Sequence, residues 1–293
     1  MDLHLEHLGQ TPFSDPGDLD TSTLPRDPRQ LAVLVRNLIV HRAEGERVGW
    51  TVPEERGHDD PEARYVTEVL RILRVREHGD RPFGAERAPE ERFVGTCRDF
   101  SLLLCSLLRA TGTPARIRCG FAGYFKEGWY DDHWVTEYRL PDGTWRLADA
   151  QVLHHSYDLP FDPLDMPRDR FLVGGDAWRM CREGRADPET FGVDGIEDVK
   201  GLWYIRANTL ADLAAAVGGV ELLPWDFWGP EIRDDKALTE GDIALTDMIA
   251  AARTDEELRE LYRDPRLTVP DEIGSYVSRT GYTAVRRVTL NRG

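Results

Sequence analysis

Residues 95–104 read Gly-Thr-Cys-Arg-Asp-Phe-Ser-Leu-Leu-Leu and place a cysteine at the beginning of an apolar segment. From Cys97 onward the apolar residues recur at helical spacing, as Phe100, Leu103, Leu104, Leu107 and Leu108. The segment is followed by Gly112 and Pro114, which are typical of a helix end. Cys97 is therefore predicted to lie in the first turn of a helix.

The first turn of a helix suits a reactive thiol. Its backbone N–H groups lack partners within the helix, and the positive end of the helix dipole favours an anion. Such a position can lower the pKa of a cysteine thiol from its free value of about 8.5, and the thiolate is the nucleophilic form. The same N–H groups could stabilise an oxyanion that develops during acyl transfer.

A predicted hairpin carries a histidine and an aspartate. His133 begins the alternating segment His-Trp-Val-Thr-Glu-Tyr, and Asp149 ends the segment that begins at Trp145. Residues 141–144, Pro-Asp-Gly-Thr, lie midway between them and are typical of a turn. The hairpin is expected to bring Asp149 opposite or nearly opposite His133, with facing side-chain stems roughly 5 Å apart. A carboxylate there could hold the imidazole tautomer and stabilise the imidazolium.

The segment from about 93 to 151 resembles the transglutaminase-like superfamily of papain-like thiol enzymes. That resemblance implies that Cys97 is the acyl-accepting nucleophile, His133 its base and Asp149 the residue that orients the base. The common superfamily pattern is His-Ala-Trp, whereas Trp134 directly follows His133 here. In this respect the chain is similar to a bacterial subgroup that carries Asp-His-Trp.

The resemblance also implies an α+β fold with a papain-like or transglutaminase-like core, in which the nucleophile helix packs on a small antiparallel sheet. The sequence predicts helices over 28–41, 61–76, near 175–183, 197–217 and 239–252, and a short helix to Arg263 after the capping box at Thr254. It predicts strands over 115–121, 133–139 and 145–149, and loops over 48–59 and 77–94. Residues 1–155 are expected to form the catalytic core with N-terminal helices, and 156–293 a mainly helical C-terminal extension packed on it.

Aromatic residues precede and follow His133. The loop 122–132 could form one wall of an acyl-binding groove. The candidate substrate-binding residues are Trp129, Tyr130, Trp134 and Glu137. Ordinary packing of a strand connection explains the aromatic side chains equally well. Glu137 shares a strand face with His133, and an ion pair with one of the many arginines is an alternative role for it.

No metal or cofactor site is predicted. The other cysteines, Cys105, Cys119 and Cys181, form no C-x-x-C pair, and no calcium loop or phosphate-binding glycine motif is present. His154 and His155 could suggest a metal site, but adjacent residues on a strand point to opposite sides. We therefore expect turnover without metal or nucleotide.

Charge and composition exclude several classes of partner. The formal net charge is −16 and the sequence pI is about 5.0, which argues against binding to nucleic acid or to an anionic membrane. The first residues, 1–7, lack the basic and apolar regions of an export signal, and no apolar segment is long enough to span a bilayer. The 4 cysteines are accordingly expected to be reduced thiols in a cytoplasmic protein.

Two functions from different classes fit the sequence. In the first, Cys97 attacks an amide or thioester of a small molecule or peptide, and the acyl group passes to water or to an amine. Nothing in the sequence decides between hydrolysis and amide-bond formation, or fixes an oligomeric state. In the second, the chain is a non-catalytic interaction domain that retains the transglutaminase fold.

Overall fold

The computed structural model describes residues 7–77 and 81–292. Two sequence-based expectations extend to residues outside these ranges. The absence of an export signal concerns mainly residues 1–6, and the predicted loop over 77–94 includes 78–80. Among the described residues, no helix combines the length and apolar character that a bilayer span requires.

The described residues form two compact units. The first unit contains the residues up to Ile117 together with Val135–Met166. The second unit contains Arg118–Trp134 and Pro167–Arg292. The chain is therefore not divided at a single position, because residues 118–134 belong to the same unit as the C-terminal residues. The expected domain boundary at residue 155 remains a prediction.

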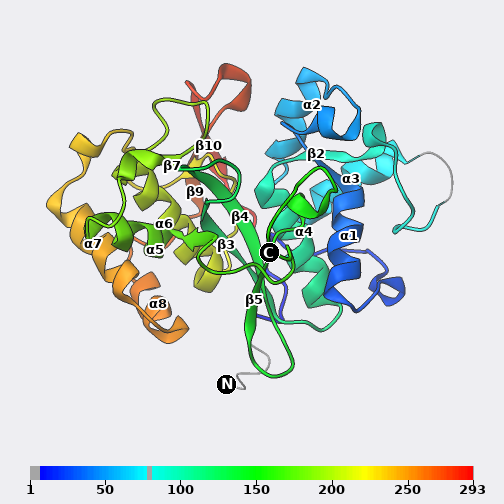
Figure 1. Cartoon of the computed structure of the whole chain (residues 1–293), viewed down its shortest axis with the longest axis horizontal. Helices are drawn as coiled ribbons and strands as arrows, with labels where there is room; N and C mark the ends of the chain where they lie inside the picture. The colour runs from blue at the N-terminus through cyan, green and yellow to red at the C-terminus, as the bar shows by residue number, and fades with distance from the viewer. Residues whose placement is uncertain (1–6, 78–80, 293) are drawn as a thin grey trace. The chain divides into compact units, whose positions relative to one another are not determined.

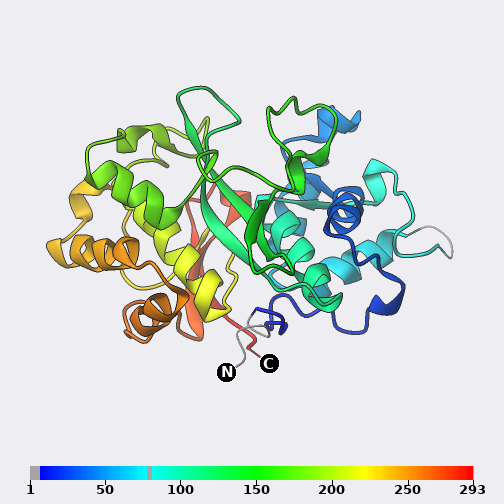
Figure 2. The ribbon, with the colours of Figure 1, turned by 60° about the horizontal axis from the view of Figure 1, so that its bottom comes forward.

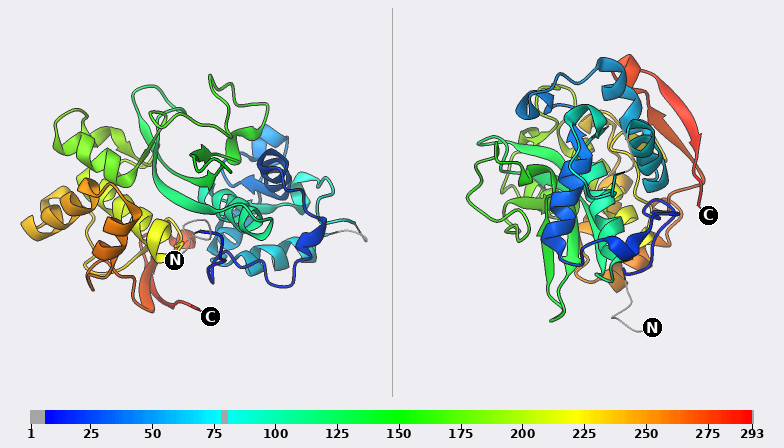
Figure 3. Two further views of the ribbon diagram at one scale, coloured as in Figure 1. Left: turned by 90° about the horizontal axis from the view of Figure 1, so that it is seen from below. Right: turned by 90° about the vertical axis from the view of Figure 1, so that its right-hand side faces the viewer.

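Helices and an antiparallel sheet make up an α+β fold, as predicted (Figure 1). The first unit contains helices α1 (Pro28–Leu38), α2 (Glu54–Asp59), α3 (Val66–Arg76) and α4 (Cys97–Ala110), with strands β1 (Ile39–His41), β2 (Phe93–Gly95) and β5 (Trp145–Ala148). Strands β3 (Ala115–Ala122) and β4 (Tyr130–Arg139) each contribute residues to both units. Helix α4 has α1 and α3 as neighbours (Figure 3).

The main sheet has the order β5-β4-β3-β6, and β7 additionally pairs with β4. Strands β6 (Phe171–Val173) and β7 (Phe191–Gly192) come from the second unit. The pairs β3–β6 and β4–β5 are antiparallel, whereas β7 runs parallel to β4. Figure 2 shows β4 beside β5 as the long hairpin of this sheet.

The hairpin of β4 and β5 confirms the turn predicted over 141–144. Gly143 has a φ of 90°, a conformation that glycine adopts without strain, and its N–H donates to the Leu140 carbonyl at 2.9 Å. The Asp142 carboxylate accepts from the Thr144 N–H at 2.9 Å. These local hydrogen bonds fix the length of the connection and thereby the pairing of the two strands.

The N-terminus of α1 is as the sequence predicts, but its C-terminus is not. Asp27 caps the helix by accepting from the Gln30 N–H at 3.0 Å, and Pro28 occupies the first helical position. The helix ends at Leu38, not at His41 as predicted. Ile39–His41 form a strand parallel to β2, because the fully buried, β-branched pair that begins it packs better in a sheet.

The helix predicted over 61–76 begins later than expected, at Val66. Asp60 does not cap this helix, because its carboxylate has other partners. The carboxylate accepts from the Val94 N–H at 2.9 Å and binds the Arg76 guanidinium at 2.7 Å. The segment predicted as a loop over 48–59 also contains α2. Local signals thus located α3 but not its first residue, and they missed α2.

The second unit contains four helices among its described residues, and all four were predicted. They are α5 (Gly174–Arg182), α6 (Leu202–Gly218), α7 (Glu240–Ala251) and α8 (Asp255–Tyr262). Thr254 caps α8 by accepting from the Glu257 N–H at 3.2 Å, as the capping box indicates.

A three-stranded sheet in the second unit was not predicted. Its order is β10-β9-β8, formed by β8 (Asp226–Phe227), β9 (Glu272–Tyr276) and β10 (Val285–Thr289). Figure 3 shows the β9–β10 hairpin. Most of β10 is exposed on both faces, so its sequence lacks the alternation that marks a half-buried strand.

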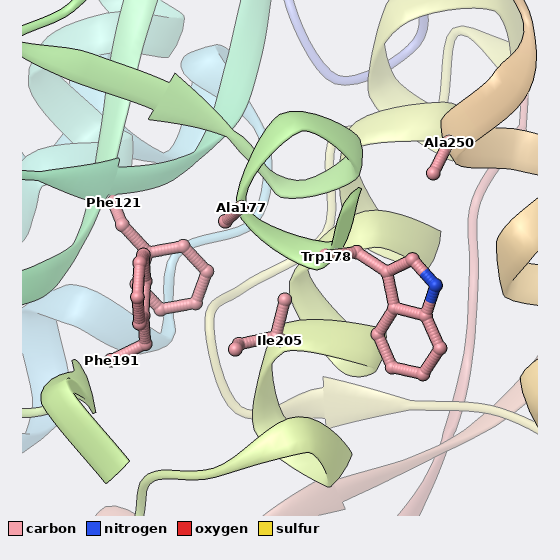
Figure 4. Close-up of a cluster of buried hydrophobic side chains, with 6 residues drawn as sticks. All are labelled: Phe121, Ala177, Trp178, Phe191, Ile205 and Ala250. Carbon is pink, nitrogen blue, oxygen red and sulfur yellow. The ribbon is translucent and has the colours of Figure 1, made fainter. Parts of the chain in front are cut away.

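Apolar packing holds the second unit together. One cluster joins residues of the sheet to α5, α6 and α7, and Figure 4 shows its six buried members: Phe121, Ala177, Trp178, Phe191, Ile205 and Ala250. Tyr130 stacks on Phe191 at the edge of this cluster, with ring centroids 4.4 Å apart. The indole N–H of Trp178 donates to Asp247 of α7 at 2.7 Å. The beginning of β4 is therefore anchored in a rigid apolar core.

Candidate active site

Cys97 is the first residue of α4, as predicted. Thr96 is extended and occupies the N-cap position, and the Cys97 side chain is 8% exposed. Gly95, the last residue of β2, allows the strand to pass close to its neighbours just before the helix begins. A Cβ there would lie 3.0 Å from Ile39 Cγ2 and 3.1 Å from Asp99 Cβ. The sequence Gly-Thr-Cys thus brings the strand β2 directly into the first turn of the helix.

Asp99 fixes the beginning of α4. Its Oδ2 accepts from the Thr96 N–H at 2.8 Å and from the Thr96 hydroxyl at 3.1 Å. Its Oδ1 accepts from Arg98 at 3.1 Å, and both side chains of this ion pair are fully buried. Burial raises the pKa of the Asp99 carboxyl, and the adjacent Arg98 cation opposes that rise. Asp99 is therefore a structural cap beside Cys97.

Helix α4 packs on strand β4 within the first unit. The Thr136 hydroxyl donates to the Ser101 carbonyl at 2.9 Å, and the Ser101 hydroxyl donates to the Cys97 carbonyl at 3.0 Å. Both bonds are buried. The sequence did not show that the hairpin lies against the first turns of the nucleophile helix, and these two bonds establish that contact.

Asp149 directly follows β5 and is 1% exposed. Its N–H donates to the Pro163 carbonyl at 2.8 Å, and its Oδ1 accepts from the Gln151 N–H at 3.0 Å. The last pair of the β4–β5 ladder joins Thr136 to Ala148. Continuing that count would set Asp149 in line with Val135, two residues along β4 from His133. The expected approach of Asp149 to His133 stays a prediction.

His133 lies in β4 and is 2% exposed. Three aromatic rings of the second unit surround its imidazole in edge-to-face geometry. The centroid distances are 5.0 Å to Phe125, 6.0 Å to Tyr124 and 6.5 Å to Phe171. Such edge-to-face packing favours one plane for the imidazole ring.

The four candidate substrate-binding residues lie in different surroundings. Glu137 is buried and pairs with Arg116 at 2.8 Å, the ion pair that was one of its two predicted roles. Tyr130 stacks on a buried phenylalanine, and Trp134 is 1% exposed. Trp129 is partly exposed, and its indole N–H lies 3.4 Å from Asp131 Oδ1.

The other cysteines lie in surroundings that oppose reactivity. Cys105 and Cys119 are 0% and 1% exposed. Cys181 is more exposed, but burial together with the charge of Asp187 raises the pKa of its thiol to about 12. A thiol with such a pKa contains almost no thiolate at neutral pH.

The adjacent histidines at 154 and 155 stack on one another, with centroids 4.0 Å apart. Burial, reinforced by the Arg36 cation, lowers the pKa of His154 to about 4, and its Nδ1 lies 2.8 Å from the Ser156 hydroxyl. Within the described part of the chain, no three His, Cys, Asp or Glu side chains gather as a metal ion would require.

A comparison with known protein families identifies one match. Residues 63–150 match the family model described as the transglutaminase-like superfamily. The matched range begins just before α3, includes Cys97 and His133, and ends one residue after Asp149. No curated protein and no solved structure matches the chain.

Proposed function

Because residues 63–150 match the model of the transglutaminase-like superfamily, we propose that this chain is an enzyme that transfers acyl groups through a cysteine. Cys97 is the nucleophile, His133 the general base and acid, and Asp149 the residue that orients His133. The observation that carries the proposal is the position of Cys97, at the first residue of a buried helix inside the matched range.

The proposed reaction has two steps. The Cys97 thiolate attacks the carbonyl carbon of an amide or thioester, and the carbonyl electrons move onto oxygen. The intermediate collapses to a thioester on Cys97 as the amine or thiol departs with a proton from His133. Water or an amine then attacks the thioester, gives its proton to His133 and releases Cys97. The N–H groups at the first residues of α4 are suited to bind the oxyanion in both steps.

We propose a small-molecule or peptide acyl donor as substrate. Tyr124 and Phe125 are partly exposed and pack on the His133 ring, which favours them over Tyr130 and Trp134 as residues that touch the acyl group. Of the four residues that the sequence suggests, Trp129 is partly exposed, whereas Tyr130 stacks on Phe191, so Trp129 is kept as a candidate. The ion pair of Glu137 with Arg116 favours a structural role for that carboxylate.

The proposal also includes the setting of the reaction. Cys97, Cys105, Cys119 and Cys181 are all free thiols, which suits a reducing compartment such as the cytoplasm. The substrate is expected to bind without nucleic acid or membrane as a partner. The residues assigned to the reaction supply nucleophile, base and oxyanion donors, so the mechanism assigns no step to a cofactor.

Limited alkylation tests the proposal before any substrate is known. With iodoacetamide at neutral pH, we expect Cys97 to be labelled at least about tenfold faster than Cys181, although Cys181 is the more exposed thiol. The reason is that the first turn of α4 favours a thiolate, whereas the pKa of Cys181 is raised. Peptide mapping by mass spectrometry measures the order of labelling.

The same measurement separates enzyme from interaction domain. Labelling of Cys181 ahead of Cys97 in the native protein would contradict the nucleophile assignment and favour a non-catalytic transglutaminase-fold domain. Denatured protein is the control, since all 4 cysteines should then react at similar rates.

A further inference from the structure

Helix α6 presents a polar stripe inside the second unit. Tyr204, Asn208 and Asp212 recur every four residues and therefore lie on one face of the helix. Asp212 binds Arg118 through both carboxylate oxygens, at 2.8 and 2.7 Å, and accepts from the Cys119 N–H at 2.9 Å. This end of the stripe is thereby fixed to strand β3.

The other end of the stripe holds Asp132. The Asp132 carboxyl lies within hydrogen-bonding reach of Tyr204 and Asn208, and both side chains favour its ionised form. The Asn208 Oδ1 accepts from the Cys119 thiol, which fixes the orientation of the amide. Asn208 and Cys119 are 5% and 1% exposed, so this network is sheltered from water.

Asp132 immediately precedes His133 in β4, and neighbouring side chains of a strand point to opposite faces. One face of this short segment is therefore bound to α6 through Asp132. On the other face the imidazole is enclosed by the rings of Phe125, Tyr124 and Phe171. The backbone that carries the proposed base is held from both sides.

We propose that Asp132 is a positioning residue for His133, held by Tyr204 and Asn208 of α6 so that the imidazole keeps its catalytic orientation. The inference rests on the proposed function, in which His133 is the base. It gives the C-terminal part of the chain a role in catalysis without contact with substrate. Because backbone misplacement of about 1 Å can lower a rate about 10²-fold, the loss of this anchor is expected to reduce turnover strongly.

The charge of Asp132 also acts on His133. Burial and the adjacent Asp131 raise the pKa of Asp132 to about 7, while His133, Tyr204 and Asn208 oppose that rise. Near neutral pH the carboxyl is therefore ionised in only part of the molecules. Its anion favours the imidazolium form of His133, since an opposite charge nearby stabilises a charged group.

Three variants test the inference. Asp132→Ala removes the anchor, and Asp132→Asn keeps an acceptor for Tyr204 but removes the charge. Asp142→Asn, in the exposed turn after β4, is the matched control. With p-nitrophenyl acetate as acyl donor, we expect Asp132→Ala to lower kcat about 10²-fold with KM within about twofold. Asp132→Asn should restore most of kcat, and Asp142→Asn should change it less than about twofold.

The pKa of His133 gives a readout that a general loss of structure would not produce. In Asp132→Asn the pKa of His133, followed by NMR of its ring protons, should be lower than in the parent protein. Suppose that Cys97 is alkylated selectively in the parent protein but that Asp132→Ala has the kcat of the parent. That result would overturn the positioning role of Asp132 and leave the proposed function standing. Failure of selective alkylation in the parent protein would instead overturn the proposed function.

The raised pKa of Asp132 also predicts a dependence of stability on pH. Between about pH 4 and 7 the folded protein keeps a proton on Asp132 that the unfolded chain has released. The folded state then binds more protons than the unfolded state, so this group makes the protein less stable as pH rises. The urea unfolding free energy of Asp132→Asn should therefore fall less between pH 5 and 8 than that of the parent protein. Parallel curves would contradict the raised pKa.

Discussion

Cys97→Ala is expected to abolish the covalent acyl adduct and to lower turnover of p-nitrophenyl acetate by on the order of 10⁴-fold or more. Removal of a catalytic nucleophile leaves only the residual contributions of binding and oxyanion stabilisation. The side chain is small and 8% exposed, so its truncation to alanine should leave the fold intact. Intact-protein mass spectrometry measures the adduct, and release of p-nitrophenol measures turnover.

Two controls accompany this variant. Cys181→Ala removes a thiol from α5 without touching the proposed site, so adduct and rate should remain as in the parent protein. EDTA should not prevent formation of the adduct, because every proposed step uses groups of the chain itself. Full activity of Cys97→Ala, or a strict need for an added divalent ion, would refute the mechanism.

The position of Cys97 could be predicted because its signals are local. Thr96 and Asp99 form the cap, and the apolar residues that follow recur at helical spacing. Each signal spans only a few residues, so no knowledge of the tertiary structure is needed. The same holds for the turn around Gly143, whose hydrogen bonds join near neighbours.

The bounds of strand β4 could not be predicted, because they depend on a partner far along the chain. The strand begins at Tyr130, three residues before the predicted start at His133. Tyr130 and Asp131 pair in parallel with Phe191 and Gly192 of β7, and no feature near residue 130 indicates that partner. Likewise Ile39 leaves the helical pattern of α1 only because β2 is available to pair with it.

Asp132 was noticed in the sequence only as part of Asp-His-Trp. Its partners lie on α6, and the signal that could have found them is the recurrence of Tyr204, Asn208 and Asp212 in a helix that is otherwise mostly apolar. Polar residues four apart on a buried face require partners, since an unpaired polar group is costly to bury. The sequence did not indicate that those partners belong to the strand carrying His133.

Asp149→Asn is expected to lower turnover of p-nitrophenyl acetate by about 10³- to 10⁴-fold with little loss of stability. The neutral amide cannot stabilise the His133 imidazolium, and it can leave the imidazole in the wrong tautomer. The fold should tolerate the change, because the amide oxygen can still accept from the Gln151 N–H as Oδ1 of Asp149 does. We therefore expect kcat to fall strongly while the melting temperature changes little.

Asp142→Asn is the matched control for this variant, since it makes the same chemical change in the turn of the same hairpin. The Asp142 carboxylate only accepts from the Thr144 N–H at an exposed position, so turnover should remain within about twofold. A turnover for Asp149→Asn equal to that of Asp142→Asn would remove Asp149 from the mechanism. If Cys97 still formed the adduct, His133 would then have to act without this carboxylate, and Asp132 would be the nearest other carboxyl along β4 that is bound to a fixed element.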